Sequence, residues 1–464
     1  MRSIISNLPG KYIELLSNIS HSPQANISGG ATMFLYNHFN INESGHLTMD
    51  GVDTVEIAKS FGTPVYVVSR SYIENAINEY HRIMSDNFGD NYTIAYASKA
   101  LSAKFIYDIL KNMNVCCDVV SGGEIYTAIA GGMPAEKLHF HGGNKTRREI
   151  EYALSAGIGS FVIDNWQEIA IIDELAKKTD SKAKVILRVK PGVDAHTHEF
   201  IQTGKEDTKF GFGIKDGKAY EAIEAILSCG NLELTGIHCH IGSQLLESKP
   251  FAMAGGIMAD FMAAIREKHG IILPQLIMGG GFGVKYTHAD KPENLDEMIK
   301  NMADAIKASC LRNDFPLPHV TIEPGRSVVA PSGITLYEVG TVKELENIRN
   351  YVSVDGGMTD NPRYALYDAR YECVIADRAG ENRDYLATIA GKCCESGDLV
   401  TKDAYIQKPQ PGDILAVFTT GAYNFSMASN YNKTPRPPLV LIENGKPVLK
   451  VRGETYEDLI RLEI

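Results

Sequence analysis

The sequence lacks any stretch of Lys and Arg dense enough to hold a nucleic-acid backbone. Its 464 residues carry 46 Lys and Arg against 57 Asp and Glu, a formal net charge of −11. Because phosphate backbones are bound by clustered positive charge, this balance argues against a nucleic-acid partner. A long apolar run is also missing near the N-terminus, where Pro9, Lys11 and Glu14 interrupt the chain. We therefore expect neither a secretory signal nor a membrane span.

Cysteine is sparse, and no two cysteines have the C-x-x-C spacing. The eight cysteines are too few for a disulfide framework, and the adjacent pairs Cys116-Cys117 and Cys393-Cys394 suit a reducing compartment. These features predict a cytoplasmic protein. The remaining composition, 44% hydrophobic and 22% charged, is typical of a soluble globular enzyme, and the length predicts two domains.

Short β-rich runs alternate with helix-like segments between residues 69 and 328. The runs cover residues 93–97, 116–119, 138–141, 160–163, 185–189, 234–240, 275–278 and 319–323. This alternation implies parallel strands and predicts an α/β fold of the (β/α)8 TIM-barrel type, with an open doubly wound sheet as the competing architecture. Two helix-like segments begin with capping boxes, Thr146 with Glu149 and, in a weaker form led by Asn, Asn165 with Glu168.

The flanking segments have a different texture. Residues 329–464 contain strand-like runs separated by turn residues, which predicts a C-terminal all-β sandwich or barrel domain. Residues 31–68 include a strand-like run at 65–68 without a helix of its own, so we expect this segment to contribute to the β domain. Residues 1–30 are rich in Ser and Asn, and we expect an N-terminal extension with a short helix near 12–16.

Polar residues follow the strands of the predicted barrel at its C-terminal end, where the active groups of such barrels gather. They are Lys99, Asp118, His141, Arg188, His240, Gly279 and Glu323, and we expect them to face one cavity. A lysine at the mouth of an apolar site loses solvation, so its neutral amine can form a Schiff base with a carbonyl compound. The alternative is a lysine that extends to the surface.

Further motifs allow more than one interpretation. The glycine run at 279–283 could close backbone N–H groups around an anion, with Ser243 as an added donor, or could be only a tight turn. His238 and His240 could form a metal pair, although a third ligand is missing nearby. His196 and His198 lie in a polar loop and are predicted to be structural or to lie at the domain interface.

The tetrapeptide 323–326 ends the last barrel strand. A buried Glu323 would keep a heterocyclic nitrogen protonated, and Arg326 would offer a bidentate fork to a carboxylate. The alternative is a plain surface ion pair beside a turn.

Together these motifs resemble the PLP-dependent decarboxylases of the alanine-racemase-like fold, most closely the members that act on diaminopimelate. The resemblance runs from about residue 34 to residue 431. Its motifs are YASKA (96–100), DVVSGGE (118–124), FHGGNK (140–145), PGVDAHTH (191–198), the His240 and Ser243 block, the glycine run, EPGR (323–326), DGGM (355–358), LYDA (366–369), CESGD (394–398) and GAY (421–423). The chain departs from the usual pattern at Leu101, Gly143 and Lys392, and none of these departures removes a catalytic group.

The resemblance implies a cofactor, pyridoxal 5'-phosphate, and a role for each matching residue. Lys99 would carry the Schiff base, His240 would stack on the pyridine ring and Glu323 would pair with its nitrogen. The cofactor edge and phosphate would be surrounded by Ser243, Gly280, Gly281, Gly325, Arg326 and Tyr423. Substrate would be bound by Arg326, Arg363, Tyr367 and Tyr423. Cys394 and Glu395 would complete the site from the other subunit of a homodimer, and Cys394 or Lys99 would return a proton to the product.

The implied activity is the decarboxylation of meso-2,6-diaminopimelate to L-lysine and CO2, with no metal. One alternative is decarboxylation of another diamino acid, such as ornithine or arginine. Racemisation is disfavoured because racemases of this fold place a cation opposite the ring nitrogen. A third alternative is an inactive decarboxylase-like protein that binds a regulator.

Overall fold

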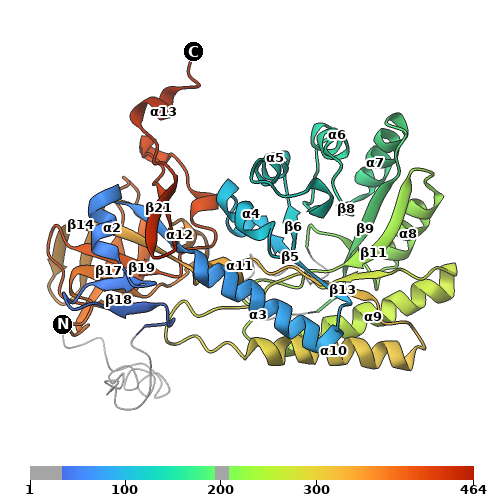
Figure 1. The fold of residues 1–464 in the computed structure, drawn as a ribbon, viewed down its shortest axis with the longest axis horizontal. Helices are drawn as coiled ribbons and strands as arrows, with labels where there is room; N and C mark the ends of the chain where they lie inside the picture. The colour runs from blue at the N-terminus through green and yellow to red at the C-terminus, as the bar shows by residue number, and fades with distance from the viewer. Residues whose placement is uncertain (1–33, 194–207) are drawn as a thin grey trace, which may run out of the picture. The chain divides into compact units, whose positions relative to one another are not determined.

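The computed structural model describes residues 34–193 and 208–464. The fold described below is that of the unit His38–Ile464, which contains a parallel barrel and a second, mainly antiparallel sheet (Figure 1). The expectations for residues 1–30, including the helix near 12–16, and for His196 and His198 lie outside the described residues.

The barrel is made of parallel strands joined in a closed ring. Its strands are β5 (Tyr92–Ala97), β6 (Cys116–Val119), β7 (Leu138–Phe140), β8 (Ser160–Ile163), β9 (Ala183–Lys190), β11 (Leu232–His238), β12 (Gln275–Ile277) and β13 (His319–Ile322). The ring closes because β9 pairs with both β8 and β11. The predicted TIM-type barrel is therefore confirmed, and the open doubly wound sheet is wrong.

Four of the strands, β7, β11, β12 and β13, end one or two residues earlier than the runs that predicted them. The run at 234–240 was expected to continue to His240, but β11 ends at His238 because its pairing with β12 stops where His238 meets Ile277. His141 and Glu323 likewise lie one residue beyond β7 and β13. Side chains that follow a strand in this way lie at the open end of the barrel.

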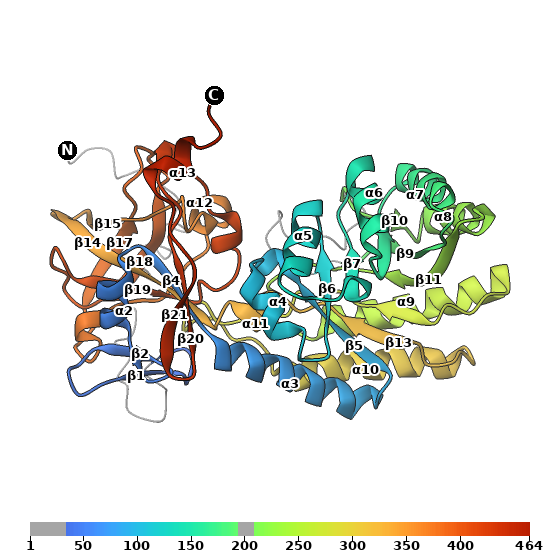
Figure 2. The same ribbon diagram turned by 45° about the horizontal axis from the view of Figure 1, so that its top comes forward.

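Helices surround the barrel on the outside (Figures 1 and 2). They are α3 (Arg70–Phe88), α4 (Lys104–Leu110), α5 (Gly122–Ala130), α6 (Arg147–Ala156), α7 (Trp166–Lys178), α8 (Lys218–Ser228), α9 (Lys249–His269) and α10 (Leu295–Arg312). Apolar faces of these helices pack on the strands, as in α3, where Ile73, Ile77 and Tyr80 are buried at helical spacing. Among the described helices, none is both long and apolar enough to span a lipid bilayer.

Of the two predicted capping boxes, one forms completely and the other forms only in part. Thr146 and Glu149 form the complete box at the start of α6, as predicted. Asn165 caps α7 by accepting from the Glu168 N–H, but the Glu168 carboxylate does not return to the Asn165 backbone. It binds the Lys145 ammonium at 3.0 Å and the Asp164 N–H at 2.9 Å instead. The weaker box is wrong in that half, because the Lys145 ammonium forms a charge-assisted hydrogen bond with the carboxylate, which is stronger than one from a neutral backbone donor.

The second sheet forms the predicted C-terminal β domain. It contains β14 (Gly333–Leu345), β15 (Arg349–Val354), β16 (Cys373–Ile375), β17 (Tyr385–Ala390), β18 (Leu399–Ile406), β19 (Ile414–Phe418), β20 (Leu439–Glu443), β21 (Lys446–Val451) and, from the N-terminal part of the chain, β4 (Val65–Ser69). β4 lies antiparallel to β14 and parallel to β20. The domain boundaries at residues 30, 68 and 328 stay predictions.

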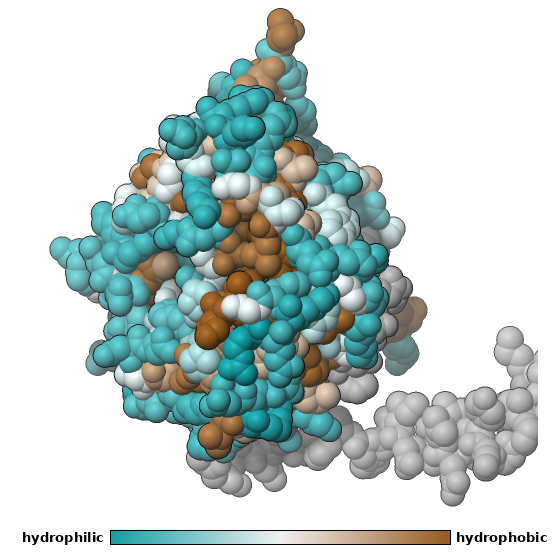
Figure 3. Space-filling model, turned by 90° about the vertical axis from the view of Figure 1, so that its right-hand side faces the viewer, coloured by the Kyte–Doolittle hydropathy of each residue, from teal (hydrophilic) through white to brown (hydrophobic). Residues whose placement is uncertain are grey.

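Smaller elements complete the fold. A three-stranded sheet of β1 (Phe39–Ile41), β2 (Leu47–Met49) and β3 (Val52–Asp53) precedes α2 (Thr54–Phe61). Three short helices follow the barrel: α11 (Arg326–Val329), α12 (Arg363–Tyr367) and α13 (Tyr456–Ile460). The surface at the barrel end of the molecule is mainly hydrophilic, with apolar residues gathered in a central band (Figure 3).

Candidate active site

A cavity of about 1510 Å³ lies at the C-terminal ends of the barrel strands. The barrel contributes Lys99, Asp118, His141, Arg188, His240 and Glu323 to its lining, and the β domain contributes Arg363, Tyr367 and Tyr423. Of the strand-end residues expected to face one cavity, only Gly279 is not part of this lining, because the run contributes Gly280 and Gly281 instead. The structure therefore brings together residues separated by more than 300 positions in the sequence.

Lys99 lies in a short 3-10 turn, Ser98–Ala100, directly after β5. The turn is held from two sides, because the Tyr96 hydroxyl donates to Leu101 O at 3.0 Å and the Tyr423 N–H donates to Ala100 O at 2.8 Å. Ser98 is buried, but the side chain of Lys99 is exposed in the cavity. The expected loss of solvation is therefore not seen in this chain, and what the fold provides is a fixed backbone with a reachable amine.

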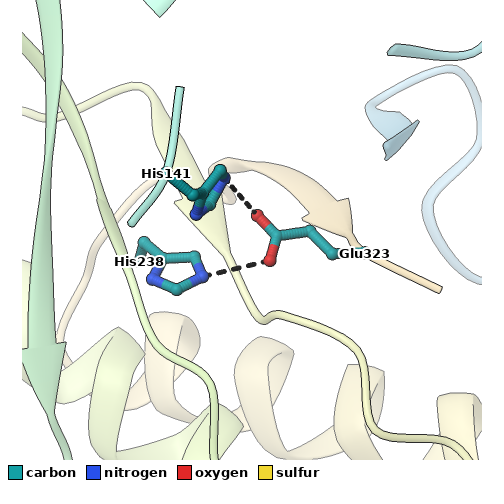
Figure 4. Close-up of side chains that lie close together, drawn as sticks. All are labelled: His141, His238 and Glu323. Carbon is teal, nitrogen blue, oxygen red and sulfur yellow. Dashed lines mark hydrogen bonds and ion pairs between the residues drawn. The ribbon is translucent and has the colours of Figure 1, made fainter. Parts of the chain in front are cut away.

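Four buried side chains, Asp118, His141, His238 and Glu323, form a cluster that we call the acid–imidazole cluster. Figure 4 shows the two imidazoles facing different oxygens of the Glu323 carboxylate. His238 Nε2 lies 3.1 Å from Oε2, and His141 Nε2 lies 3.3 Å from Oε1. His141 Nε2 is also 3.3 Å from Asp118 Oδ1. A carboxylate that is only 7% exposed is thus compensated by two ring nitrogens.

The cluster separates the pKa values of its members. Burial lowers the pKa of His238 to about 4. Burial also acts to lower the pKa of His141, but the charges of Glu323 and Asp118 outweigh it and raise the pKa to about 9. For Glu323, burial is outweighed by His238 and His141, so its pKa lies well below the ordinary range. Burial and the Glu323 charge raise the pKa of Asp118 to about 7. At neutral pH the cluster therefore holds an ionised glutamate beside an imidazolium.

His240 is placed differently from His238. It is partly buried at the cavity wall, and burial together with the positive charge of Lys99 lowers its pKa well below the ordinary value. A neutral imidazole of this kind can pack against an aromatic ring. The alternative of a metal pair formed by His238 and His240 is not supported: among the described residues, the set of three with ligand atoms within 4.8 Å of one another is His141, His238 and Glu323.

The glycine run forms a wall without room for side chains. A Cβ atom on Gly280 would lie 2.0 Å from Glu323 O, and one on Gly281, where φ is +108°, would lie 2.2 Å from Gly242 O. Gly325 has a similar restriction, with Ala97 Cβ at 2.9 Å from its hypothetical Cβ. Backbone alone therefore faces the cavity here, which is what the close approach of a phosphate requires.

Two arginines of the cavity are stacked among tyrosines. The Arg326 guanidinium lies 4.8 Å from the ring centroid of Tyr423, and it donates to the Tyr286 hydroxyl at 2.5 Å and to Ser243 Oγ at 3.0 Å. Arg363 lies 5.2 Å from the Tyr286 ring and 5.7 Å from the Tyr367 ring.

Arg326 and Arg363 are only 7% and 6% exposed, respectively. Among the described residues neither has a carboxylate partner within ion-pair distance. The Nε atoms of Arg326 and Arg363 also have no hydrogen-bond acceptor. Because buried charges are normally compensated, this arrangement calls for anionic groups inside the cavity.

Cys394 and Glu395 are not brought to the cavity of their own chain. They lie in the exposed turn between β17 and β18, and neither lines the cavity. The Cys394 N–H donates to Asn432 Oδ1 at 3.0 Å, which ties this turn to the β domain. Their role from a second subunit stays a prediction.

Sequence reasoning missed Tyr286 and the shared contact of His141 with two carboxylates. Tyr286 lies in an irregular segment after the glycine run and carries no motif, so its position below both arginines depends on the folded loop. The pairing of Asp118 with His141 follows from the adjacency of β6 and β7, which barrel topology could have indicated.

The site fits pyridoxal phosphate on the observations above. A reachable lysine amine, a buried ionised carboxylate, a neutral histidine and a backbone wall beside an uncompensated arginine correspond to the aldehyde, ring nitrogen, ring face and phosphate of that cofactor. The family model described as pyridoxal-dependent decarboxylase, pyridoxal binding domain, matches residues 74–330. The chain belongs to the pyridoxal-dependent decarboxylase family, and pyridoxal 5'-phosphate is its cofactor.

Within that family, its relatives include diaminopimelate decarboxylases. The one from Bacillus subtilis (strain 168) is 44% identical over 432 residues, 93% of this chain and 98% of the relative. The one from Staphylococcus aureus (strain COL) is 45% identical over 420 residues, 90% of this chain and 98% of the relative. The crystal structure of the M. jannaschii enzyme with L-lysine has a TM-score of 0.84 and 36% identity, covering 92% of this chain and 98% of that one.

Proposed function

We propose that the protein decarboxylates meso-2,6-diaminopimelate to L-lysine and CO2. The observation that carries this proposal is the pair of buried arginines, Arg326 and Arg363, which lack carboxylate partners among the described residues and lie in the lysine-containing cavity. The relatives named diaminopimelate decarboxylase support it, at 44% identity over 93% of the chain. The M. jannaschii enzyme was crystallised in complex with L-lysine, which is the product expected here.

Residues of this chain would hold the cofactor in defined ways. Lys99 would attach it through its amine, His240 would pack against the ring and Glu323 would pair with the ring nitrogen. Ser243 and the wall of Gly280 and Gly281 would surround the phosphate. When bound, the cofactor supplies an electron sink for the pair of electrons that remains when CO2 leaves.

The protein's own contribution is charge and orientation. An ionised Glu323 keeps a pyridine nitrogen protonated, which sustains the electron sink. Arg326, Arg363, Tyr367 and Tyr423 would hold the carboxylates of the substrate and so fix which bond breaks. The walls of the cavity would then limit the access of water while a proton is delivered to the α carbon by Lys99 or by Cys394.

We infer the substrate from the number of buried arginines in the cavity, because each of them calls for an anionic group. Diaminopimelate carries two carboxylates, whereas ornithine and arginine have no carboxylate at the distal end. A substrate whose distal end carries only a cation would leave the buried charge of Arg363 without an anionic partner. This favours diaminopimelate over the other diamino acids. The inactive binding protein is disfavoured because Lys99, His240 and Glu323 all line one cavity.

The active unit we infer is a homodimer in which Cys394 and Glu395 of one chain complete the site of the other. Their location in an exposed turn of the β domain, outside their own cavity, supports this arrangement. We further propose that the protein acts in the cytoplasm. All eight cysteines are free thiols, including the adjacent pairs, which agrees with a reducing compartment.

The proposed function is tested by measuring CO2 release with the cofactor-loaded protein. We expect turnover with meso-diaminopimelate, and rates lower by at least about tenfold with ornithine, arginine and lysine, since an unfilled site for a charged group typically costs this much. Turnover with ornithine that equals or exceeds turnover with meso-diaminopimelate would make ornithine the substrate instead. No CO2 from any of the four amino acids would contradict the activity itself.

A further inference from the structure

The acid–imidazole cluster contains more ionisable groups than a single carboxylate facing a ring nitrogen requires. Glu323 alone would supply the charge, yet Asp118, His141 and His238 are buried around it. Asp118 and His238 lie in β6 and β11, and His141 and Glu323 directly follow β7 and β13. A set assembled from so many elements has a fixed geometry, because each strand is held by its own ladder.

The contacts assign a different task to each imidazole. His238 has a lowered pKa, so it is neutral at neutral pH and its Nε2–H donates to Oε2 of the carboxylate at 3.1 Å. His141 Nε2 faces two carboxylate oxygens, Asp118 Oδ1 and Glu323 Oε1, each at 3.3 Å. One ring therefore orients Glu323 by a hydrogen bond, and the other compensates its charge.

We propose that His141 and Asp118 are positioning residues, which hold Glu323 as an oriented carboxylate before the cofactor binds and so raise the affinity for its ring. This inference rests on the proposed cofactor site and deepens it. Asp118 acts through His141, since its Oδ1 and Glu323 Oε1 share one ring nitrogen, His141 Nε2, at 3.3 Å each. Neither residue is required to touch the reacting atoms.

The geometry explains why two acids are buried together. With His141 absent, Asp118 and Glu323 would be like charges without the imidazolium that they share, which favours protonation of one of them. A protonated Glu323 is a donor and an acceptor rather than a pure acceptor, so it would pair less well with a protonated ring nitrogen. The other titratable groups that interact electrostatically with His141, namely His139, Glu124 and His238, do not replace its charge, because the two histidines have a lowered pKa and Glu124 is an acid.

The test uses protein freed of cofactor and measures the dissociation constant for pyridoxal phosphate by absorbance titration. We expect His141→Asn, which keeps a donor but carries no charge, to bind about tenfold or more weakly, because the charge of a close neighbour typically shifts an ionisation by one unit or more. Asp118→Asn is expected to weaken binding in the same direction and by less. His139→Gln is the matched control, since His139 is on the same strand and contacts Ser160 instead, and its dissociation constant should stay within about twofold of wild type.

A second readout does not involve cofactor or activity. Nitrogen NMR of the imidazoles in the cofactor-free protein should show His141 protonated and His238 neutral at pH 7.5, and His141 should lose its proton at lower pH in Asp118→Asn. A wild-type dissociation constant for His141→Asn, or a neutral His141 at pH 7.5, would overturn the proposal. If His141→Asn does not fold, as judged by circular dichroism, Asp118→Asn carries both measurements, and a wild-type dissociation constant or an unchanged His141 titration in it would likewise overturn the proposal. A protein that shows these changes yet releases no CO2 from diaminopimelate would contradict the proposed function and leave this inference in place.

Discussion

The acid–imidazole cluster and the turn between β17 and β18 both carry residues assigned to one site, but the structure treats them differently. The cluster is buried and complete within a single chain. The turn, with Cys394 and Glu395, is exposed and separate from the cavity of its own chain. The comparison indicates that the barrel builds the buried cluster within one chain, whereas the turn does not reach the cavity of its own chain, as the proposed dimer requires.

The largest loss of activity is expected from a substitution in the barrel. Lys99→Ala should abolish the visible absorbance of the bound cofactor and lower turnover by at least about 10²-fold, the lower end of what removing an acid–base group costs. Lys104→Ala, in an exposed position at the start of α4, is the control and should be active. Normal turnover in Lys99→Ala would end the assignment of this cavity as the active site.

Glu323→Gln should follow, with turnover lowered by about 10²-fold, since the amide keeps the shape but removes the charge that stabilises a protonated ring nitrogen. Steady-state rates and the absorbance maximum of the bound cofactor are the measurements. Because the effect is on charge, substrate KM should change less than kcat. A rise in KM with unchanged kcat would show that Glu323 binds substrate instead.

Mixing two inactive variants tests the turn directly. Cys394→Ala and Lys99→Ala homodimers should each be nearly inactive, but random exchange of subunits should restore about a quarter of wild-type activity, because half of the dimers then contain one intact site out of two. Activity is measured after the variants are dissociated and reassociated together. If activity does not recover although mass spectrometry shows that subunits have exchanged, Cys394 acts in the site of its own chain. The turn would then not differ from the cluster in depending on a second chain.

Asp398 connects the turn to the rest of the β domain, and its substitution should have a smaller effect. Its carboxylate accepts the N–H groups of Cys393 and Met358, both at 2.6 Å, and it is only 3% exposed. Asp398→Asn should lower the free energy of unfolding by about 1–3 kcal/mol, the usual range for a buried group that loses a charged partner. Chemical denaturation beside the exposed Asp384→Asn control measures this, and equal stabilities would mean that the turn is held by other contacts.

His141 should also make the free energy of unfolding depend on pH. Its folded pKa is raised from 6.5 to about 9 by Glu323 and Asp118, so between these values the folded state binds more protons than the unfolded state. The stabilisation is complete below pH 6.5 and is lost as the pH rises through about 9. Unfolding of the cofactor-free protein at pH 6.5 and 9.5 should show a decrease that is smaller in His141→Asn, and an identical slope in both proteins would contradict the raised pKa.

The barrel could be predicted from the sequence because buried parallel strands need apolar residues on both faces. Runs such as Ser160–Ile163, which is buried throughout, recur along the sequence at regular intervals and can be recognised there. The strand-end residues were predictable for the same reason, since the polar residue after each run is the first to leave the core. The half-formed capping box of Asn165 was not predictable, because Glu168 is taken by Lys145 from another loop.

By itself, the sequence determined the order of strands and helices, the lysine after the first barrel strand and the family to which the chain belongs. Tertiary structure alone decided that His141 lies between two carboxylates, that Tyr286 lies beneath both arginines and that Cys394 lies outside its own cavity. The physical reason is that hydrophobic periodicity is written along the chain. Charge compensation and ring stacking depend on distances between residues that only closure of the barrel brings together.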